Sequence, residues 1–232
     1  MLLLKVSDLT IEYPDGTRAV DTVSFSIKPG ENVALIGANG AGKTSLLLAL
    51  MGILPVKSGE INIGERVLNK KNLRDIRAKV GFVFQNPDDQ LFMPEIYEDV
   101  AFGPRNFGYN EEETAQKVDA ALTRLGINHL AKRSPLKLSG GEKRLAAIAT
   151  VLAMEPELLL FDEPAAFLDP RARRNLTTIL KELPQSKLIA THDLIFAQET
   201  CTRVLLLKNG KLIADTRIGL LKDTKTLIAA GL

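Results

Sequence analysis

The chain has 232 residues, which is enough for one large α/β domain with a sizeable buried core. Its formal net charge of +2 argues against a polybasic nucleic-acid-binding protein, and its one cysteine, Cys201, cannot form an internal disulfide. The longest apolar run, Leu46 to Val56, is too short to span a bilayer, so any membrane role should need a separate membrane subunit.

The first third of the chain predicts mostly strands. They are expected at residues 3–13 and 20–27, since apolar residues alternate with serines in "VSFSI". The apolar run 32–36 predicts a buried strand, and the helix after it should stop near Gly52. Further short strands are expected at 59–64 and 80–84. A β-rich N-terminal portion should therefore lie beside the rest of the fold.

Residues from 86 to about 154 read mostly as helix. The clearest case is the segment 110–126, where Asn110 is a suitable N-cap, Glu113 lies three residues further on and Gly126 closes the helix. One apolar stripe follows the length of this helix and contains Ala115, Val118, Leu122 and Leu125. We interpret this part of the chain as a helical insert.

Strand and helix alternate again in the last third. The expected elements are strand 158–162, helix 170–182, strand 187–191, helix 193–200 and a hairpin turning at Asn209-Gly210. Such alternation is typical of a parallel sheet. The sequence therefore predicts a single α/β domain over residues 1–232, with a mostly parallel core sheet flanked by helices, an N-terminal antiparallel β portion and a helical subdomain insert at about 86–154.

A phosphate-binding loop is predicted between the buried strand and the first helix. The segment fits the pattern G-x-x-x-x-G-K-[ST] in full, and the alternative is an ordinary glycine-rich turn. Backbone N–H groups should approach a polyphosphate here, Lys43 should reach its β- and γ-phosphates, and the Thr44 hydroxyl should ligate Mg²⁺. The expected nucleotide-binding residues are Gly37, Ala38, Asn39, Gly40, Ala41, Gly42, Lys43, Thr44 and Ser45.

Two carboxylates, Asp162 and Glu163, stand at the end of a buried strand, where ligands bind in open α/β sheets. Asp162 is placed to hold the Mg²⁺ shell and Glu163 to polarise an attacking water, unless both are merely solvated surface acids. His192 ends the next core strand, where it can bond the γ-phosphate or the water. His129 has no such context, and we interpret it as a surface residue.

A second anion-binding device lies about a hundred residues after the first. Ser139 is a good N-cap, and two glycines and an apparent helix follow it. A helix N-terminus offers free backbone N–H groups and the positive end of a dipole, which suit a phosphate. One chain thus carries two phosphate-binding devices.

Together these segments resemble the ATP-binding cassette family, the nucleotide-hydrolysing subunits of ABC transporters, over essentially the whole chain. By this resemblance residues 37–44 are the Walker A motif, 138–142 the signature, 158–162 the Walker B motif and 166–169 the D-loop. The glutamine loop would begin at Gln85, and His192 would be the switch histidine.

The resemblance also implies activity and partners. ATP would be hydrolysed with Mg²⁺, in a head-to-tail dimer whose signature in one copy closes on ATP held by the other. The implied residues are, for catalysis, Gln85, Lys43, Glu163 and His192; for the metal, Thr44, Gln85 and Asp162; and for the partner's γ-phosphate, Ser139, Gly140, Gly141 and Glu142. Tyr13 matches the aromatic residue that stacks on adenine, although it can also be a plain strand-edge aromatic.

Two positions depart from the family pattern. Leu145 stands where the family usually has Arg, and Arg144 lies one residue earlier, which is about 100° away around a helix. Phe167 replaces a small residue of the D-loop, where the two copies should meet. We expect both departures to affect closure of the dimer rather than the reacting atoms.

Residues 84–92 and 98–108 resemble the ATPases of energy-coupling factor transporters, and residues 164–176 suggest the cobalt and nickel importers among them, with vitamin importers as the alternative. This implies a peripheral protein on the cytoplasmic face of the membrane. Its partners would be a second ABC ATPase copy or paralogue, a transmembrane scaffold and a substrate-binding membrane subunit, with no nucleic acid. The transported molecule should not touch this chain.

The sequence argues against two other classes of protein. A soluble cassette ATPase of DNA repair or translation should carry long coiled-coil insertions or a second phosphate loop, and the sequence has neither. A nucleotide kinase or GTPase leaves "LSGGE" and His192 unexplained. An apolar surface rimmed by acids at Asp88, Asp89 and Glu95 is predicted to receive a basic amphipathic helix of a membrane partner, the alternative being a solvated loop.

Overall fold

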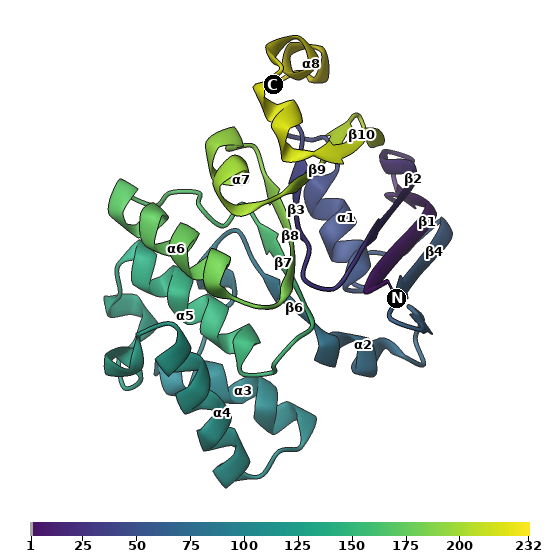
Figure 1. Cartoon of the computed structure of the whole chain (residues 1–232). Coiled ribbons are helices and arrows are strands. Elements are labelled where there is room, and N and C mark those ends of the chain that lie inside the picture. The colour runs from purple at the N-terminus through teal and green to yellow at the C-terminus, as the bar shows by residue number, and fades with distance from the viewer. Residues whose placement is uncertain (1) are drawn as a thin grey trace.

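Two sheets organise residues 2–232, the part of the chain that the computed structural model describes (Figure 1). The N-terminal sheet is antiparallel throughout and runs in the order β2-β1-β4-β5. Its strands are β1 (Leu4–Glu12), β2 (Arg18–Ile27), β4 (Ser58–Ile63) and β5 (Arg66–Val67). The predicted antiparallel N-terminal portion is confirmed.

The second sheet has six strands in the order β10-β9-β3-β8-β7-β6, and all neighbours are parallel except the hairpin of β9 and β10. Its strands are β3 (Asn32–Ile36), β6 (Val80–Val83), β7 (Leu158–Asp162), β8 (Ser186–Thr191), β9 (Arg203–Lys208) and β10 (Lys211–Arg217). Parallel strands end at the same edge, so the segments after β3, β6, β7 and β8 meet there.

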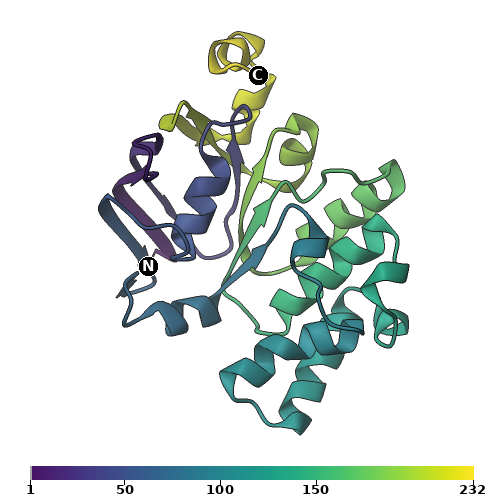
Figure 2. The same ribbon diagram turned by 180° about the vertical axis from the view of Figure 1, so that it is seen from behind.

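The central strands are buried on both faces, which explains their continuous apolar runs. In β3, Val33 and Leu35 face the core shared with helix α1 and the N-terminal sheet, whereas Ala34 and Ile36 face a second core beneath the other helices. The covering helices, drawn in Figures 1 and 2, are α1 (Lys43–Leu50), α5 (Gly140–Leu152), α6 (Pro170–Glu182) and α7 (Leu194–Thr200).

The predicted helical insert consists chiefly of α3 (Ile96–Phe107), α4 (Glu111–Arg124) and α5, which contact one another. Asn110 and Glu113 form a reciprocal capping box at the start of α4, and Gly126 follows its end with φ 68°. In both ribbon views α3 and α4 lie at the opposite end of the molecule from the C-terminal helix α8 (Thr224–Ala230).

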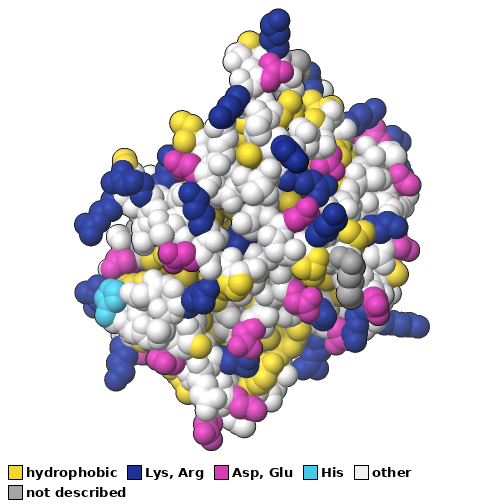
Figure 3. Space-filling model, viewed as in Figure 1, with side chains coloured by type: hydrophobic (Ala, Val, Ile, Leu, Met, Phe, Trp, Pro, Cys, Tyr) yellow, Lys and Arg dark blue, Asp and Glu magenta, His cyan; other side chains and the backbone are white. Residues whose placement is uncertain are grey.

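No clear sequence pattern predicts β5, helix α2 (Leu73–Lys79) or α8; β5 is exposed, and α2 buries only Ile76. The predicted hairpin is present, with positive φ at both Asn209 and Gly210, as its tight turn requires. No helix within residues 2–232 is long and apolar enough to cross a membrane. On the face drawn in Figure 3, acidic and basic side chains are interspersed rather than gathered by sign.

Candidate nucleotide site

The loop between β3 and α1 takes a conformation that only glycine adopts without strain at two positions. Gly40 has φ 78° and Gly42 φ 101°, and a Cβ on Gly42 would also collide with the carbonyl oxygen of Ala19. The loop curls around its own lysine, since Lys43 Nζ donates to the carbonyl oxygens of Gly37 at 2.7 Å and Ala38 at 3.3 Å. The buried ammonium group of Lys43 therefore lies among the backbone groups of the loop, as a polyphosphate-binding site requires.

A cavity of about 530 Å³ opens over this loop at the carboxyl edge of the sheet. It gathers most of the residues that the sequence analysis selected: Tyr13, Asn39, Gly40, Ala41, Gly42, Lys43, Thr44, Ser45, Gln85, Asp162, Glu163 and His192. Gly37 and Ala38 contribute the carbonyl groups that hold Lys43. Thr17, Arg18 and Ala19, at the start of β2, also line the cavity and were not selected, because nothing in their sequence distinguishes them from a strand edge.

The two carboxylates after β7 are both buried but have different surroundings. Asp162 Oδ2 accepts a hydrogen bond of 2.8 Å from the Thr44 hydroxyl, while its Oδ1 is buried without a partner. Burial raises the pKa of Asp162 above its ordinary value; the hydrogen bond from Thr44 opposes this rise most strongly, and the charge of Glu163 adds to it. An unpartnered carboxylate oxygen beside a hydroxyl is a donor set that suits Mg²⁺, so these residues fit the metal that the sequence analysis expected.

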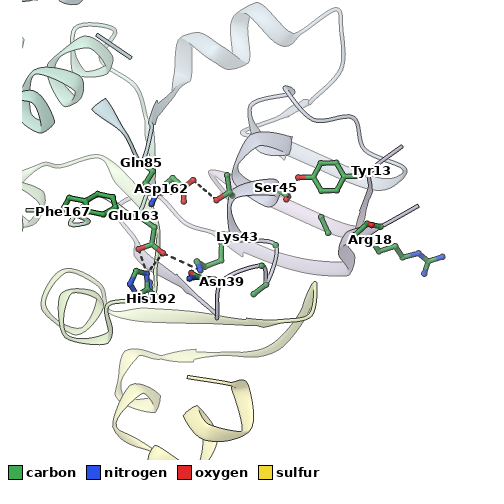
Figure 4. Close-up of a pocket in the computed structure, with 16 residues that line it drawn as sticks. Tyr13, Arg18, Asn39, Lys43, Ser45, Gln85, Asp162, Glu163, Phe167 and His192 are labelled. Atoms are coloured by element: carbon green, nitrogen blue, oxygen red, sulfur yellow. Dashed lines mark hydrogen bonds and ion pairs between the residues drawn. The ribbon is translucent and has the colours of Figure 1, made fainter. Parts of the chain in front are cut away.

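Glu163 is held by four groups from three residues, and Figure 4 shows two of these residues, Lys43 and His192, beside it. Its Oε1 lies 2.9 Å from His192 Nδ1 and 3.7 Å from Lys43 Nζ. Its Oε2 accepts the Thr191 hydroxyl at 2.9 Å and the backbone N–H of His192 at 3.3 Å. Thr191 was not selected from the sequence, where it is simply the last residue of a strand.

Tyr13 lies in the turn between β1 and β2, at one side of the cavity, and its hydroxyl is 2.8 Å from the hydroxyl of Ser45 (Figure 4). This contact orients the ring at the mouth of the loop. The ring is 37% exposed and so offers free apolar surface to a flat ligand, as the predicted adenine contact requires.

The segment at Ser139, which the sequence predicts to be a second phosphate-binding site, lies outside this cavity. Ser139 caps α5 through a reciprocal box with Glu142, and Ser139 lowers the pKa of that carboxyl through hydrogen bonds from its backbone N–H and hydroxyl. Ser139, Gly141 and Glu142 line a separate cavity of about 570 Å³ together with residues of α6, and Gly140 lines a third. Within one copy, the two devices therefore serve different cavities.

The two departures from the family pattern take different places. Arg144 is buried and donates to backbone carbonyls at the start of the glutamine loop, whereas Leu145 lines the cavity beside Ser139. Phe167 has φ 62° and is 94% exposed, and it lines the nucleotide cavity on the side of Gln85 and Glu163 (Figure 4).

A parallel sheet that presents a phosphate loop and adjoining carboxylates at one edge defines the class of P-loop nucleoside triphosphatases. Comparison with known proteins places the chain more closely: residues 20–166 match the model of the ABC transporter family, to which this chain belongs. It is therefore an ABC-type ATPase that binds ATP.

Relatives and solved structures support the same assignment. The chain is 47% identical to a putative ABC transporter ATP-binding protein of Geobacter sulfurreducens, over 92% of this chain and 86% of the relative. It is 42% identical to the energy-coupling factor transporter ATP-binding protein EcfA of Carboxydothermus hydrogenoformans, over 100% of this chain and 87% of the relative. The predicted resemblance to the energy-coupling factor branch is confirmed.

Two solved structures have the same fold. That of cbiO1 from Clostridium perfringens, part of the ABC transporter complex cbiONQ, has a TM-score of 0.88 and 38% identity, and covers 98% of this chain and 93% of its own. The dimeric post-hydrolysis structure of the ATP-binding cassette MJ0796, bound to ADP and Pi, has a TM-score of 0.81 and 28% identity. The match covers 93% of this chain and 98% of the MJ0796 chain.

Proposed function

We propose that the chain is the ATP-hydrolysing subunit of a membrane importer of the energy-coupling factor type, working at the cytoplasmic face of the membrane. The observation that carries this proposal is the convergence of Lys43, Asp162, Glu163 and His192 in one cavity, in a chain similar to EcfA over its whole length. The similarity to cbiO1, a part of a cbiONQ complex, supports uptake of cobalt or nickel ions. A vitamin is the alternative cargo.

ATP would lie over the phosphate loop, with its adenine against Tyr13 and its phosphates against the backbone N–H groups of residues 37–45. Thr44, Asp162 and Gln85 would hold Mg²⁺, which supplies Lewis-acid stabilisation of the phosphate charge when bound. The Oδ1 of Asp162, which is buried without a partner, would be available to the metal in this arrangement.

Glu163 would act as the general base toward the attacking water. In the ligand-free arrangement its Oε1 is shared between Lys43 and His192. When Lys43 turns to the β- and γ-phosphates, Oε1 loses one cation and becomes free to accept a proton. His192 remains beside Glu163, fixes its orientation and can donate to the γ-phosphate.

Two copies of the chain would complete each site. The Ser139 device cannot serve the ATP of its own copy, since it lines a different cavity from Lys43. A head-to-tail dimer brings the Ser139 device of one copy to the phosphate loop of the other. The dimeric structure of the neighbour MJ0796 supports this arrangement.

A surface beside the glutamine loop would receive the membrane scaffold, which in turn would contact a separate substrate-binding membrane subunit. Phe92 is 62% exposed and packs edge-to-face on Phe102, and the buried Asp99 accepts the backbone N–H groups of Phe92 and Met93. One predicted rim acid, Asp88, is engaged in an ion pair with Lys143 at 2.6 Å. Scaffold binding should therefore depend mainly on the apolar pair, with a weaker contribution from charge.

Reconstitution tests this proposal. The chain, its scaffold and the substrate-binding subunit are placed in vesicles, and ATP-driven uptake of radioactive Co²⁺ and Ni²⁺ is compared with that of vitamins. Uptake should require ATP and fail with Lys43→Ala. An ATPase-active chain that never co-purifies with membrane subunits would instead favour the soluble cassette class.

A further inference from the structure

Arg144 is a buried cation that the proposed hydrolysis does not use. It is 2% exposed on α5, the helix that begins at Ser139. Its Nη1 donates to the carbonyl oxygen of Phe84 and its Nη2 to that of Gln85, each at 2.6 Å, while its Nε has no partner. Burial lowers the pKa of Arg144 to about 10, an effect that the charge of Asp162 opposes.

Burying the Arg144 guanidinium in this way has an unfavourable desolvation free energy. A buried cation normally has a carboxylate partner or a full set of acceptors. Here the guanidinium of Arg144 donates hydrogen bonds to only two neutral carbonyl groups. An apolar side chain such as Met would fill the same volume without that cost. The cost is understandable if the fork of two donors is needed to fix the backbone at Gln85, since its planar geometry restrains two successive carbonyls at once.

Two further contacts tie the same loop to the same helix. The Gln90 side chain donates to the Ala147 carbonyl oxygen and the Thr150 hydroxyl, both at 2.7 Å. Lys143 pairs with Asp88 at 2.6 Å. The segment 84–90 is thus attached to α5 along its length, and of these contacts only that of Arg144 reaches Gln85.

The geometry points to Arg144 as a positioning residue that links the two ATP sites of the proposed dimer. Ser139 and Arg144 lie within one and a half turns of a single rigid helix. When the partner's phosphate binds at Ser139, α5 shifts or becomes fixed, and Arg144 transmits that change to Gln85 in its own site. This inference rests on the proposed function, because it requires both a dimer and a role for Gln85.

The test measures ATPase rate against ATP concentration for the wild type, Arg144→Met and Arg144→Lys. The wild type should show a Hill coefficient above unity. Arg144→Met should bring that coefficient to unity and lower kcat by roughly 10- to 100-fold, the usual effect of misplacing a catalytic contact. Arg144→Lys should fall between, since a single ammonium reaches one carbonyl at a time. Ser139→Arg is then added to each protein so that it stays monomeric. The ATP affinity of these monomers should be the same with Arg144 and with Arg144→Met.

Arg124→Met is the matched control, because Arg124 also donates to a backbone carbonyl, that of Glu182 at 3.0 Å, but lines neither nucleotide cavity. It should keep wild-type cooperativity. A folded Arg144→Met with an unchanged Hill coefficient overturns the inference, and if that variant does not fold, wild-type cooperativity in Arg144→Lys does so. A wild-type coefficient of unity also overturns it. The proposed function fails on different measurements: Glu163→Gln forms no dimer with MgATP, or the chain never co-purifies with membrane subunits.

Discussion

Glu163 is the side chain on which the proposed chemistry depends most directly. Its replacement by Gln keeps the shape and the hydrogen-bonding reach but removes the capacity to accept a proton. Glu163→Gln should therefore bind MgATP normally and lose roughly 10²–10⁴ in kcat, the usual contribution of a general base. A single-turnover ATPase assay beside a nucleotide-binding assay measures both quantities.

Lys43→Ala provides the contrast, because it removes the cation that should meet the phosphates. Its main effect should be weaker nucleotide binding. If Glu163→Gln hydrolysed ATP at the wild-type rate, another group would have to be the base.

Lys187 carries another buried charge, far in sequence from the phosphate loop. It is 1% exposed on β8, and its Nζ donates to Asn32 and to the carbonyl oxygens of Leu183 and Gln185. Burial lowers the pKa of Lys187 from 10.5 to about 8, and the other titratable group facing it is the Cys201 thiol, whose pKa burial raises to about 11. Between pH 8 and 10.5 the unfolded chain therefore binds more protons at Lys187 than the folded one.

Stability from Lys187 should rise with pH across that window. The free energy of unfolding of the wild type, measured relative to Lys187→Met by urea titration, should increase by on the order of 2 kcal/mol between pH 7.5 and 10.5. Cys201 acts in the opposite direction in both proteins, so the difference removes its effect. A difference that is flat or falls with pH would show that Lys187 is not buried as a cation.

At the scale of elements, the turn between β7 and α6 displays Phe167 under strain. A bulky residue at φ 62° costs about 1–2 kcal/mol, and a ring that is 94% exposed gains nothing from its own chain in return. A contact with the second copy would account for both features.

Phe167→Gly and Phe167→Ala separate the two effects. The Gly variant should be more stable than the Ala variant by about 1 kcal/mol in thermal unfolding, because only Gly adopts this φ freely. In the Glu163→Gln background both should weaken MgATP-dependent dimerisation equally, since both remove the ring. Ile213→Ala, which truncates an exposed residue of β10, is the control and should leave the dimer intact. If the Phe167→Gly and Phe167→Ala variants formed dimers as tight as those of the parent Glu163→Gln protein, the exposed ring would not contribute to the dimer contact.

The long elements of the fold were predictable because their patterns are strong and local. The apolar strands β3, β7 and β8 each fill a central position, and α4 has both a capping box and a buried stripe. In contrast, α2 buries only Ile76, and β5 has two exposed residues, so neither leaves a periodic signal.

The candidate site was predictable where chemistry requires a particular residue at a particular spacing, as in the phosphate loop and the pair Asp162 and Glu163. The contacts of Thr191 and Arg144 were not, since they depend on how β8 and α5 are placed in space. A helical wheel shows that Arg144 and Leu145 point in different directions, but it does not show which of them meets the glutamine loop.

At the scale of the whole molecule, the proposed dimer should depend on nucleotide. ATP held between two copies stabilises their association by mass action. Glu163→Gln should shift from monomer to dimer on addition of MgATP, measured by light scattering after size-exclusion chromatography. Ser139→Arg, added to this variant, should abolish the shift because the bulk and charge of the arginine would occupy the place proposed for the partner's phosphate.

Two controls make that result specific. ADP in place of ATP should leave the protein monomeric, because in the proposed dimer Ser139 would contact the γ-phosphate, which ADP lacks. Dimers that form equally without nucleotide, and also with Ser139→Arg, would mean that the second phosphate-binding device does not act across an interface.

The chain's one cysteine, Cys201, is 5% exposed at the end of α7, and burial raises the pKa of its thiol to about 11. A thiol that is both covered and protonated at neutral pH reacts slowly with maleimides. The native sequence is therefore already a silent background for labelling. A single new cysteine at an exposed position, such as Leu136 near the signature, gives one fluorophore per copy, so energy transfer between donor- and acceptor-labelled copies can follow opening and closing during turnover.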